Sequence, residues 1–125
     1  MNVLVQYLAI GAAGSLGAML RYAVANLCGR LLRTDFPVGT LVINLTGSLF
    51  LGWFLTVIRE RMPVSDTFRL AVAVGFVGAY TTFSTFAYES SELLEDGSGM
   101  KAMVNMFGSI LLGLLAVRLG IWLAT

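Results

Sequence analysis

Four long apolar stretches constrain this chain more than any other feature of its sequence. They cover residues 3–28, 38–58, 68–88 and 103–124 of a chain of 125 residues. A helix that spans a bilayer needs about 20 mostly apolar residues, and each stretch is long enough. The separators between the stretches are short and hold most of the charged residues. We therefore expect an all-α membrane protein, with a single four-helix transmembrane domain over residues 1–125.

The composition supports lipid as the solvent and excludes several classes of site. Only 12% of the residues are charged, against about 25% in a typical soluble domain. The chain has one cysteine, Cys28, and no histidine, which excludes disulfides within one chain, multi-cysteine metal sites and imidazole-based sites. The formal net charge of +1 gives no sign of a nucleic-acid partner.

The loops carry no charge bias that would fix the orientation of the chain. With four spans, the two termini and the 59–67 loop share one side of the membrane, and the 29–37 and 89–101 loops share the other. The first side has Arg59, Arg61 and Arg69, and the second has Arg30, Arg33 and Lys101. The side richer in Lys and Arg is normally cytoplasmic. A balance of three against three leaves two alternatives open: one orientation with a weak signal, or insertion in both.

Insertion in both orientations would allow two antiparallel chains to pair. Their two-fold axis would lie in the membrane plane, as it does between the inverted repeats of many transporters. Size also favours an oligomer, because four helices form one bundle with a packed centre and leave little room for an aqueous path inside a single chain.

The polar residues in the middle of the spans form patterns and include no carboxylate. Proton-coupled transporters and cation carriers usually need an intramembrane carboxylate. Thr40, Asn44 and Ser48 recur at i, i+4 and i+8, which places them on one stripe of a helix. Such a stripe is either a set of interhelical hydrogen bonds or the wall of a polar pathway. Asn105 and Ser109 repeat the spacing more weakly, and helix packing is the favoured interpretation there.

The first span combines small residues with an arginine. Gly14, Gly17 and Ala18 would let helix backbones approach closely. Arg21 follows them inside the span, and we expect its side chain either to extend toward the membrane surface or to find backbone carbonyls or water.

The third span contains the segment GFVGAYTTFSTF, residues 75–86, which is poorly suited to a plain membrane helix. Gly75 and Gly78 weaken the helix, and threonine hydroxyls that bond to preceding carbonyls bend it or support a break. Irregular backbone at membrane depth survives only when it is buried in protein or lines a cavity. A break would leave carbonyls for a cation and N–H groups for an anion; close packing of the glycines is the alternative.

Phe83 and Phe86 lie at i and i+3 and share one face of the predicted helix. An aromatic ring has a positive edge, so two rings presented edge-on could stabilise a small anion without a formal charge. The amide of Asn44 and the hydroxyls of Ser84, Thr85 and Thr40 would add donors. Conduction needs weak binding at several sites, which a neutral path provides; ordinary core or lipid-facing packing of the rings is the alternative.

Three segments resemble a known family. GFVGAYTTFSTF followed by AYES resembles the third-helix signature of the Fluc (CrcB) fluoride channels. GTLVINLTGSLFLG resembles their second helix with its pore-facing asparagine, and GAAGSLGAMLRY is similar to their glycine-rich first-helix segment that ends in arginine. The resemblance implies an antiparallel, dual-topology homodimer with two fluoride pathways and a broken third helix. It also implies a structural sodium ion on the two-fold axis, bound by backbone carbonyls at that break.

The resemblance also assigns roles to individual residues. It implies that the pore is lined by an aromatic pair, an amide and nearby hydroxyls, which are Phe83, Phe86, Asn44, Ser84, Thr85, Thr40 and, in the fourth span, Ser109. The carbonyls of Gly78 and Thr81 would bind sodium, and Arg21 and Glu89 match the first-helix arginine and the acidic residue at the vestibule mouth. The chain departs from the family pattern at two adjacent positions, Ala79 and Tyr80, where Gly and Leu are expected.

The function that follows from these observations is passive export of fluoride across a bacterial inner membrane by a multi-pass channel that is not an enzyme. Its partners would be fluoride, the lipid bilayer and a second copy of the chain. One alternative is a small proton-coupled multidrug-type exporter, which would need a glutamate in the first span, where none is present. The other is a non-transporting membrane assembly subunit, in which the polar stripe serves packing alone.

Overall fold

The computed structural model describes residues 2–125, which form helices and loops and no β-strand. The elements are α1 (Val3–Leu31), α2 (Val38–Glu60), α3 (Asp66–Leu70), the π-helix η1 (Ala71–Val77), α4 (Gly78–Tyr80), α5 (Phe83–Glu95) and α6 (Gly99–Ala124). By length and apolar composition α1, α2, α6 and the segment Asp66–Glu95 could each cross a membrane. The predicted all-helical class with four apolar helical segments is confirmed.

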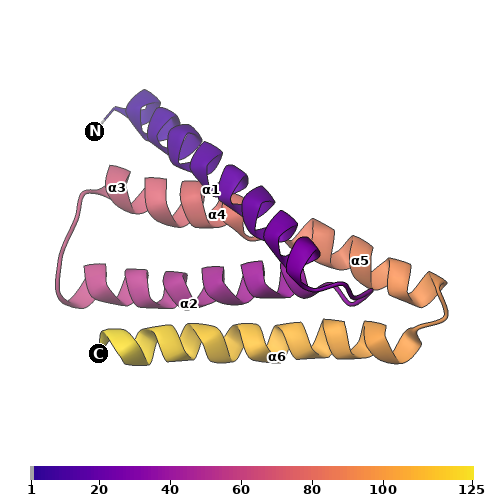
Figure 1. Cartoon of the computed structure of the whole chain (residues 1–125). Helices are drawn as coiled ribbons and strands as arrows, with labels where there is room; N and C mark the ends of the chain where they lie inside the picture. Colours follow the sequence, from indigo (N-terminus) through magenta and orange to yellow (C-terminus); the bar gives the residue numbers. More distant parts are fainter. Residues whose placement is uncertain (1) are drawn as a thin grey trace.

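The helical segments overlap the four predicted spans and extend beyond them. The α1 helix continues to Leu31, and the third segment begins at Asp66 and reaches Glu95. Both termini and the loop between α2 and α3 lie at one end of the molecule, and the other two loops lie at the opposite end (Figure 1). This is the distribution of loops expected from four consecutive spans.

Glycines bring the helices into backbone contact at two places. The α2 and α6 helices run side by side along most of their length (Figure 1), and a Cβ on Gly52 or Gly120 would overlap the backbone of the facing helix. The α1 helix crosses the η1 segment, where a Cβ on Gly17 would overlap the carbonyl oxygen of Phe76. Close backbone approach through small residues is how helices associate in lipid, and the expectation for Gly14 and Gly17 is confirmed.

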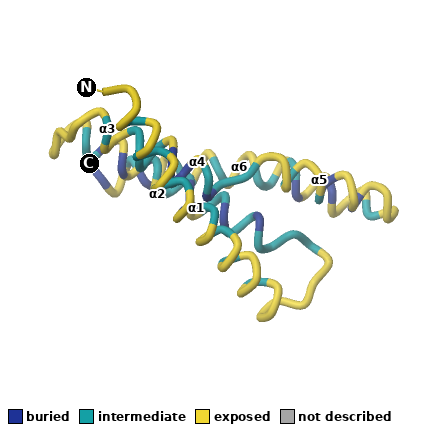
Figure 2. Tube along the Cα trace, turned by 90° about the horizontal axis from the view of Figure 1, so that it is seen from above, coloured by how far each residue is buried: buried dark blue, intermediate teal, exposed yellow. Residues whose placement is uncertain are grey.

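Few side chains are buried within a single chain. Ile43 is the one large side chain that is fully enclosed among the described residues, at 1% exposure. Large apolar side chains cover the outside of α1 and α6, for example Leu8, Phe107 and Trp122, and most of the trace is exposed or intermediate (Figure 2). Such a surface suits a lipid environment or contact with another chain.

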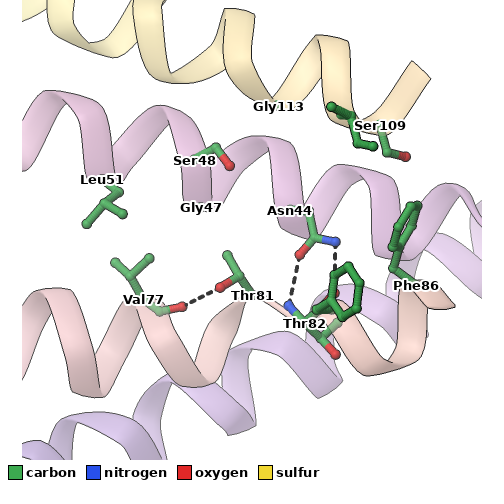
Figure 3. A pocket seen from close by; sticks show the side chains of 12 residues that line it. Asn44, Gly47, Ser48, Leu51, Val77, Thr81, Thr82, Phe86, Ser109 and Gly113 are labelled. Carbon is green, nitrogen blue, oxygen red and sulfur yellow. Dashed lines mark hydrogen bonds between the residues drawn. The ribbon is translucent and has the colours of Figure 1, made fainter. Parts of the chain in front are cut away.

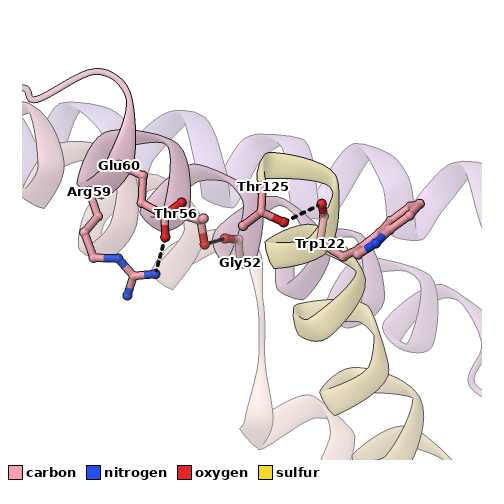
Figure 4. A network of polar contacts seen from close by, with 6 residues as sticks. All are labelled: Gly52, Thr56, Arg59, Glu60, Trp122 and Thr125. Atoms are coloured by element: carbon pink, nitrogen blue, oxygen red, sulfur yellow. Dashed lines mark hydrogen bonds and ion pairs between the residues drawn. The ribbon is translucent and has the colours of Figure 1, made fainter.

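Polar contacts lie at both ends of the bundle, and at each end one of them joins segments that are distant in the sequence. Figure 4 shows the end that holds the termini. There the Thr56 hydroxyl donates to the Gly52 carbonyl at 2.8 Å, and Arg59 forms an ion pair with Glu60. The Thr125 hydroxyl donates to the carbonyl oxygen of Trp122. Arg61 also donates to the carbonyl oxygen of Thr125 at 2.9 Å, which joins the end of α2 to the end of α6.

At the opposite end, Lys101 at the start of α6 bonds both carboxylate oxygens of Asp35, at 2.8 and 2.9 Å. The hydrogen bond from Lys101, and then its charge, lower the pKa of the Asp35 carboxyl below its ordinary value. The α5 helix ends in a Schellman motif, with Gly97 at positive φ and the Ser98 N–H donating to the Leu93 carbonyl. This turn reverses the chain from α5 into α6.

Candidate functional site

The third segment changes its backbone conformation four times between Asp66 and Glu95. It starts as an α-helix capped by the Ser65 hydroxyl, continues as the π-helix η1, and returns to one α-helical turn that ends at Tyr80. Thr81 and Thr82 are extended, with ψ of 157° and 122°. The Thr82 hydroxyl then accepts a hydrogen bond from the Thr85 N–H and caps α5. The π-helix was not predicted, although π-helical turns are frequent at functional sites.

Asn44 of α2 binds both backbone polar groups of Thr82. Its Nδ2 donates to the Thr82 carbonyl at 3.0 Å, and its Oδ1 accepts from the Thr82 N–H at 2.9 Å (Figure 3). The amide therefore replaces the hydrogen bonds that a continuous helix would have made there. An amide carries two N–H donors, and residues 2–125 use only one of those of Asn44, which leaves the second N–H for a ligand.

We call the extended residues Thr81 and Thr82, together with the last turn of α4, the junction. Two neighbours of Asn44 on α2 also contact this junction. Gly47 leaves room for it, since a Cβ there would overlap the methyl group of Thr81. Thr46 donates to the Val42 carbonyl at 2.8 Å, and its oxygen lies 2.8 Å from the Tyr80 hydroxyl. These two hydroxyls therefore share a hydrogen bond, in which Tyr80 donates whenever the Thr46 proton is given to Val42. Tyr80, one of the two departures from the family pattern, is thus tied to α2.

The junction leaves some backbone oxygens paired and others unpaired. The Val77 carbonyl accepts from the N–H and the hydroxyl of Thr81, both at 2.9 Å, and the Ala79 carbonyl accepts from Arg21 Nε at 3.0 Å. Arg21 thus has a backbone carbonyl as partner, one of the outcomes expected from the sequence. Within residues 2–125, the carbonyl oxygens of Gly78 and Thr81 accept no hydrogen bond.

A pocket of about 310 Å³ lies beside the junction, between α2, α5 and α6 (Figure 3). It is lined by Asn44, Gly47, Ser48, Leu51, Val77, Thr81, Thr82, Phe83, Phe86, Ser109, Ile110 and Gly113. None of these residues is charged. The pocket wall is mostly apolar, and its polar side chains are an amide and hydroxyls, which can donate hydrogen bonds to an anion.

The two phenylalanines are neighbours at one side of this pocket. Their ring centroids are 5.8 Å apart and the rings are tilted by 53°. Phe86 is half-buried, whereas Phe83 is 78% exposed in the single chain. In the single chain this ring forms part of the exposed apolar surface beside the pocket, where lipid or another chain would contact it.

The structure brings some of the predicted residues together and separates others. Asn44, Thr81, Phe83, Phe86 and Ser109 line one pocket. Outside that lining lie Thr40, which is buried in α2, the exposed Ser84, Thr85 and Gly78, and the half-buried Arg21 and Glu89. Among the described residues, no group hydrogen-bonds Glu89 Oε1. Ser48 was not predicted as a site residue, although it lies on the same helical stripe as Asn44.

Comparison with known proteins gives consistent similarities. The sequence profile of a family described as CrcB-like protein, Camphor Resistance (CrcB), matches residues 8–121. The chain is 44% identical over 118 residues to the fluoride-specific ion channel FluC 2 of Moorella thermoacetica, across 94% of each chain. It is 44% identical to fluoride-specific ion channels FluC of Hydrogenovibrio crunogenus, over 94% of this chain and 89% of the relative, and of Acidobacterium capsulatum, over 92% of each.

The contact between Asn44 and Thr82 predicts a large effect of Asn44→Leu on stability. Each unpaired buried peptide group costs about 1–3 kcal/mol, so we expect the free energy of unfolding to fall by about 2–6 kcal/mol. Tyr80→Phe removes only one hydroxyl and should cost about 1 kcal/mol. Unfolding of the purified variants in detergent with increasing dodecyl sulfate measures both values; equal effects of the two substitutions would contradict the assignment.

Proposed function

The chain belongs to the CrcB-like protein family, and on this premise we propose that it is a fluoride-selective channel that exports fluoride passively from the bacterial cytoplasm. It is a multi-pass protein of the inner membrane, a channel rather than an enzyme. Passive export of fluoride would give resistance to it, because the ion leaves down its electrochemical gradient whenever it accumulates inside.

The observation that carries this proposal is the neutral, donor-bearing pocket between α2, α5 and α6. Fluoride is small and strongly hydrated, so a path must replace its water with hydrogen-bond donors. The free N–H of Asn44 and the hydroxyls of Ser48 and Ser109 are such donors, and the edges of Phe83 and Phe86 are positive. A pocket with no charged side chain binds an anion weakly enough to release it.

We extend the proposal to an antiparallel homodimer with one pathway along each chain. Its support is that Phe83 is 78% exposed at the side of a pocket that a single chain leaves open. Ser84 and Thr85 are also exposed, so they would reach the ion only in a paired assembly. Thr40 would be near the path, and Glu89, one turn beyond Phe86, would lie at its vestibule. The equal numbers of basic residues at the two membrane faces are compatible with insertion in both orientations.

A sodium ion on the two-fold axis would satisfy the backbone at the junction. Carbonyl oxygens without partners are costly at membrane depth, and those of Gly78 and Thr81 accept no hydrogen bond within residues 2–125. Hard monovalent cations are bound by such oxygens, and the two-fold axis would double the number of ligands. These residues fit the ion; when bound, it would supply charge that fixes the junction. Arg21, bonded to the Ala79 carbonyl, would support the same turn.

Fluoride flux through the phenylalanine variants tests the channel proposal. We expect Phe83→Ile or Phe86→Ile to lower fluoride efflux from proteoliposomes by about tenfold or more, equivalent to about 1.4 kcal/mol of barrier, while the dimer stays intact. An ion-selective electrode measures fluoride and chloride efflux. Phe107→Ile is the matched control, because Phe107 is 63% exposed and lies outside the pocket.

The same measurement separates the alternatives. Fluoride-selective efflux by the parent protein without a proton gradient supports the channel. Export of an organic cation driven by protons would support a multidrug-type exporter, and no flux at all would support an assembly subunit. Parental flux in both phenylalanine variants would overturn the assignment of the rings to the pathway.

Dual topology predicts that one site is reached from both sides of the membrane. Met62, in the loop after α2, is 62% exposed, so Met62→Cys in a Cys28→Ala background presents one thiol. A membrane-impermeant maleimide applied to spheroplasts should label about half of the molecules. The other half should be labelled only after lysis. Labelling of all or none from outside would establish a single orientation.

The proposed sodium site predicts that the dimer becomes less stable when sodium is removed. Protein kept in a buffer with N-methylglucamine as the only cation should unfold at a lower temperature than protein in sodium, because the carbonyls of Gly78 and Thr81 would lose their ligand. Sodium added back should restore the unfolding temperature. Identical unfolding temperatures in the two buffers, after exhaustive exchange, would contradict the sodium site.

A further inference from the structure

A chain of hydrogen bonds connects two walls of the pocket through the space between α5 and α6. The Ser109 hydroxyl donates to Asn105 Oδ1 at 3.4 Å, and Asn105 Nδ2 donates to the Ser90 hydroxyl at 2.9 Å. The Ser90 hydroxyl in turn donates to the carbonyl oxygen of Phe86 at 2.8 Å. The chain thus begins at one residue that lines the pocket and ends on the backbone of another.

The two central residues of this chain are buried, and each is hydrogen-bonded on both sides. Asn105 is 2% exposed and Ser90 is 4% exposed. Both ends of the Asn105 amide are used, and the Ser90 hydroxyl both accepts and donates. Within residues 2–125, the bond between Asn105 and Ser90 is the only side-chain hydrogen bond between α5 and α6. It therefore links α5 to α6 one turn beyond Phe86.

We propose that Asn105 is a positioning residue for the pathway, acting through Ser90 on Phe86. This inference rests on the proposed function. The bonds from Asn105 to Ser90 and from Ser90 to Phe86 are short and fix the turn of α5 that carries the ring. Displacement of that turn would move the ring relative to Asn44 and Ser109, and contacts that select a small ion depend on such distances.

The bond at the other end of the chain has a different character. At 3.4 Å the contact from Ser109 to Asn105 is long and weak. The Ser109 hydroxyl can therefore leave Asn105 and donate to an anion in the pocket at little cost. The Asn105 amide stays bonded to Ser90 meanwhile, so the position of α5 does not depend on where the Ser109 proton points.

Ser90 allows the hydroxyl to be separated from the shape of the side chain. Thr and Val have nearly the same volume, and only Thr keeps the hydroxyl that joins Asn105 to the Phe86 carbonyl. We expect Ser90→Thr to retain parental fluoride efflux in proteoliposomes and Ser90→Val to lose on the order of tenfold, the effect of one broken buried hydrogen bond. Ser91→Val is the control, because Ser91 is the adjacent, exposed residue of the same helix.

Equal efflux through the Thr and Val variants of Ser90 would overturn the proposal, since side-chain shape alone would then matter. If both variants fail to insert, Ser90→Ala replaces them, because it removes the hydroxyl without adding volume. Low flux of inserted Ser90→Ala supports the proposal, and parental flux overturns it. Absence of fluoride efflux in the parent protein itself would instead reject the proposed function.

A double-mutant cycle tests whether Asn105 acts through Ser90. Asn105→Leu alone should reduce fluoride efflux about as much as Ser90→Val, and the double variant should be no slower than either single variant. Additive losses would show that the two residues act independently and would overturn the proposal. Gel-filtration profiles and unfolding temperatures of all variants provide the measure of folding against which the fluxes are compared.

Discussion

Two hydrogen bonds between the Asn44 amide and the backbone of Thr82 are the interaction on which the rest of this structure depends. In lipid, a peptide group without a partner costs several kcal/mol, which is why helices normally cross the membrane without interruption. At Thr82 the third segment is not helical and lacks its own helical hydrogen bonds. The Asn44 amide supplies a donor and an acceptor there instead. The extended residues between α4 and α5 can therefore persist beside α2.

The same interruption gives the chain two chemically different surfaces. On the side of α4 it leaves the carbonyl oxygens of Gly78 and Thr81 without donors in the described chain, which suits a cation. On the side of α5 it starts a new helix, whose N-terminus is positive, and places Phe83 and Phe86 beside the pocket. The extended residues Thr81 and Thr82 thus adjoin both the neutral pocket, which we propose binds an anion, and the unpaired carbonyls, which we propose bind a cation.

Neutrality explains how such a pocket could be selective without trapping its ion. A lysine or arginine in the pocket would hold an anion strongly, and a carboxylate would exclude it. The lining contains neither kind of residue, so the fit of donors and ring edges to the ion would decide what enters. That fit depends on fixed distances between α2, α5 and α6. The buried Asn105–Ser90 bond and the glycine contacts between α2 and α6 are the features that maintain those distances.

Much of the fold and part of the site could be predicted from the sequence. The four apolar stretches determined the helical segments and the ends at which the loops lie, because apolar length alone decides what can cross a bilayer. Periodicity identified Asn44, and helical spacing paired Phe83 with Phe86. The same stripe also suggested Thr40, which lies outside the pocket. Helical spacing shows which residues share a face of α2, but not how far along that face the pocket extends.

Other features depended on contacts between distant parts of the chain. The partner of the Asn44 amide, the bond from Tyr80 to Thr46 and the partner of Arg21 join residues that lie far apart in sequence and meet only when the helices pack. The π-helix η1, packed against α1, has no signature of its own in the residue pattern. The sequence by itself determined the membrane-spanning helices and a neutral set of polar residues. Only the tertiary structure decided which of those residues share a pocket, because that depends on which helix faces close on one another.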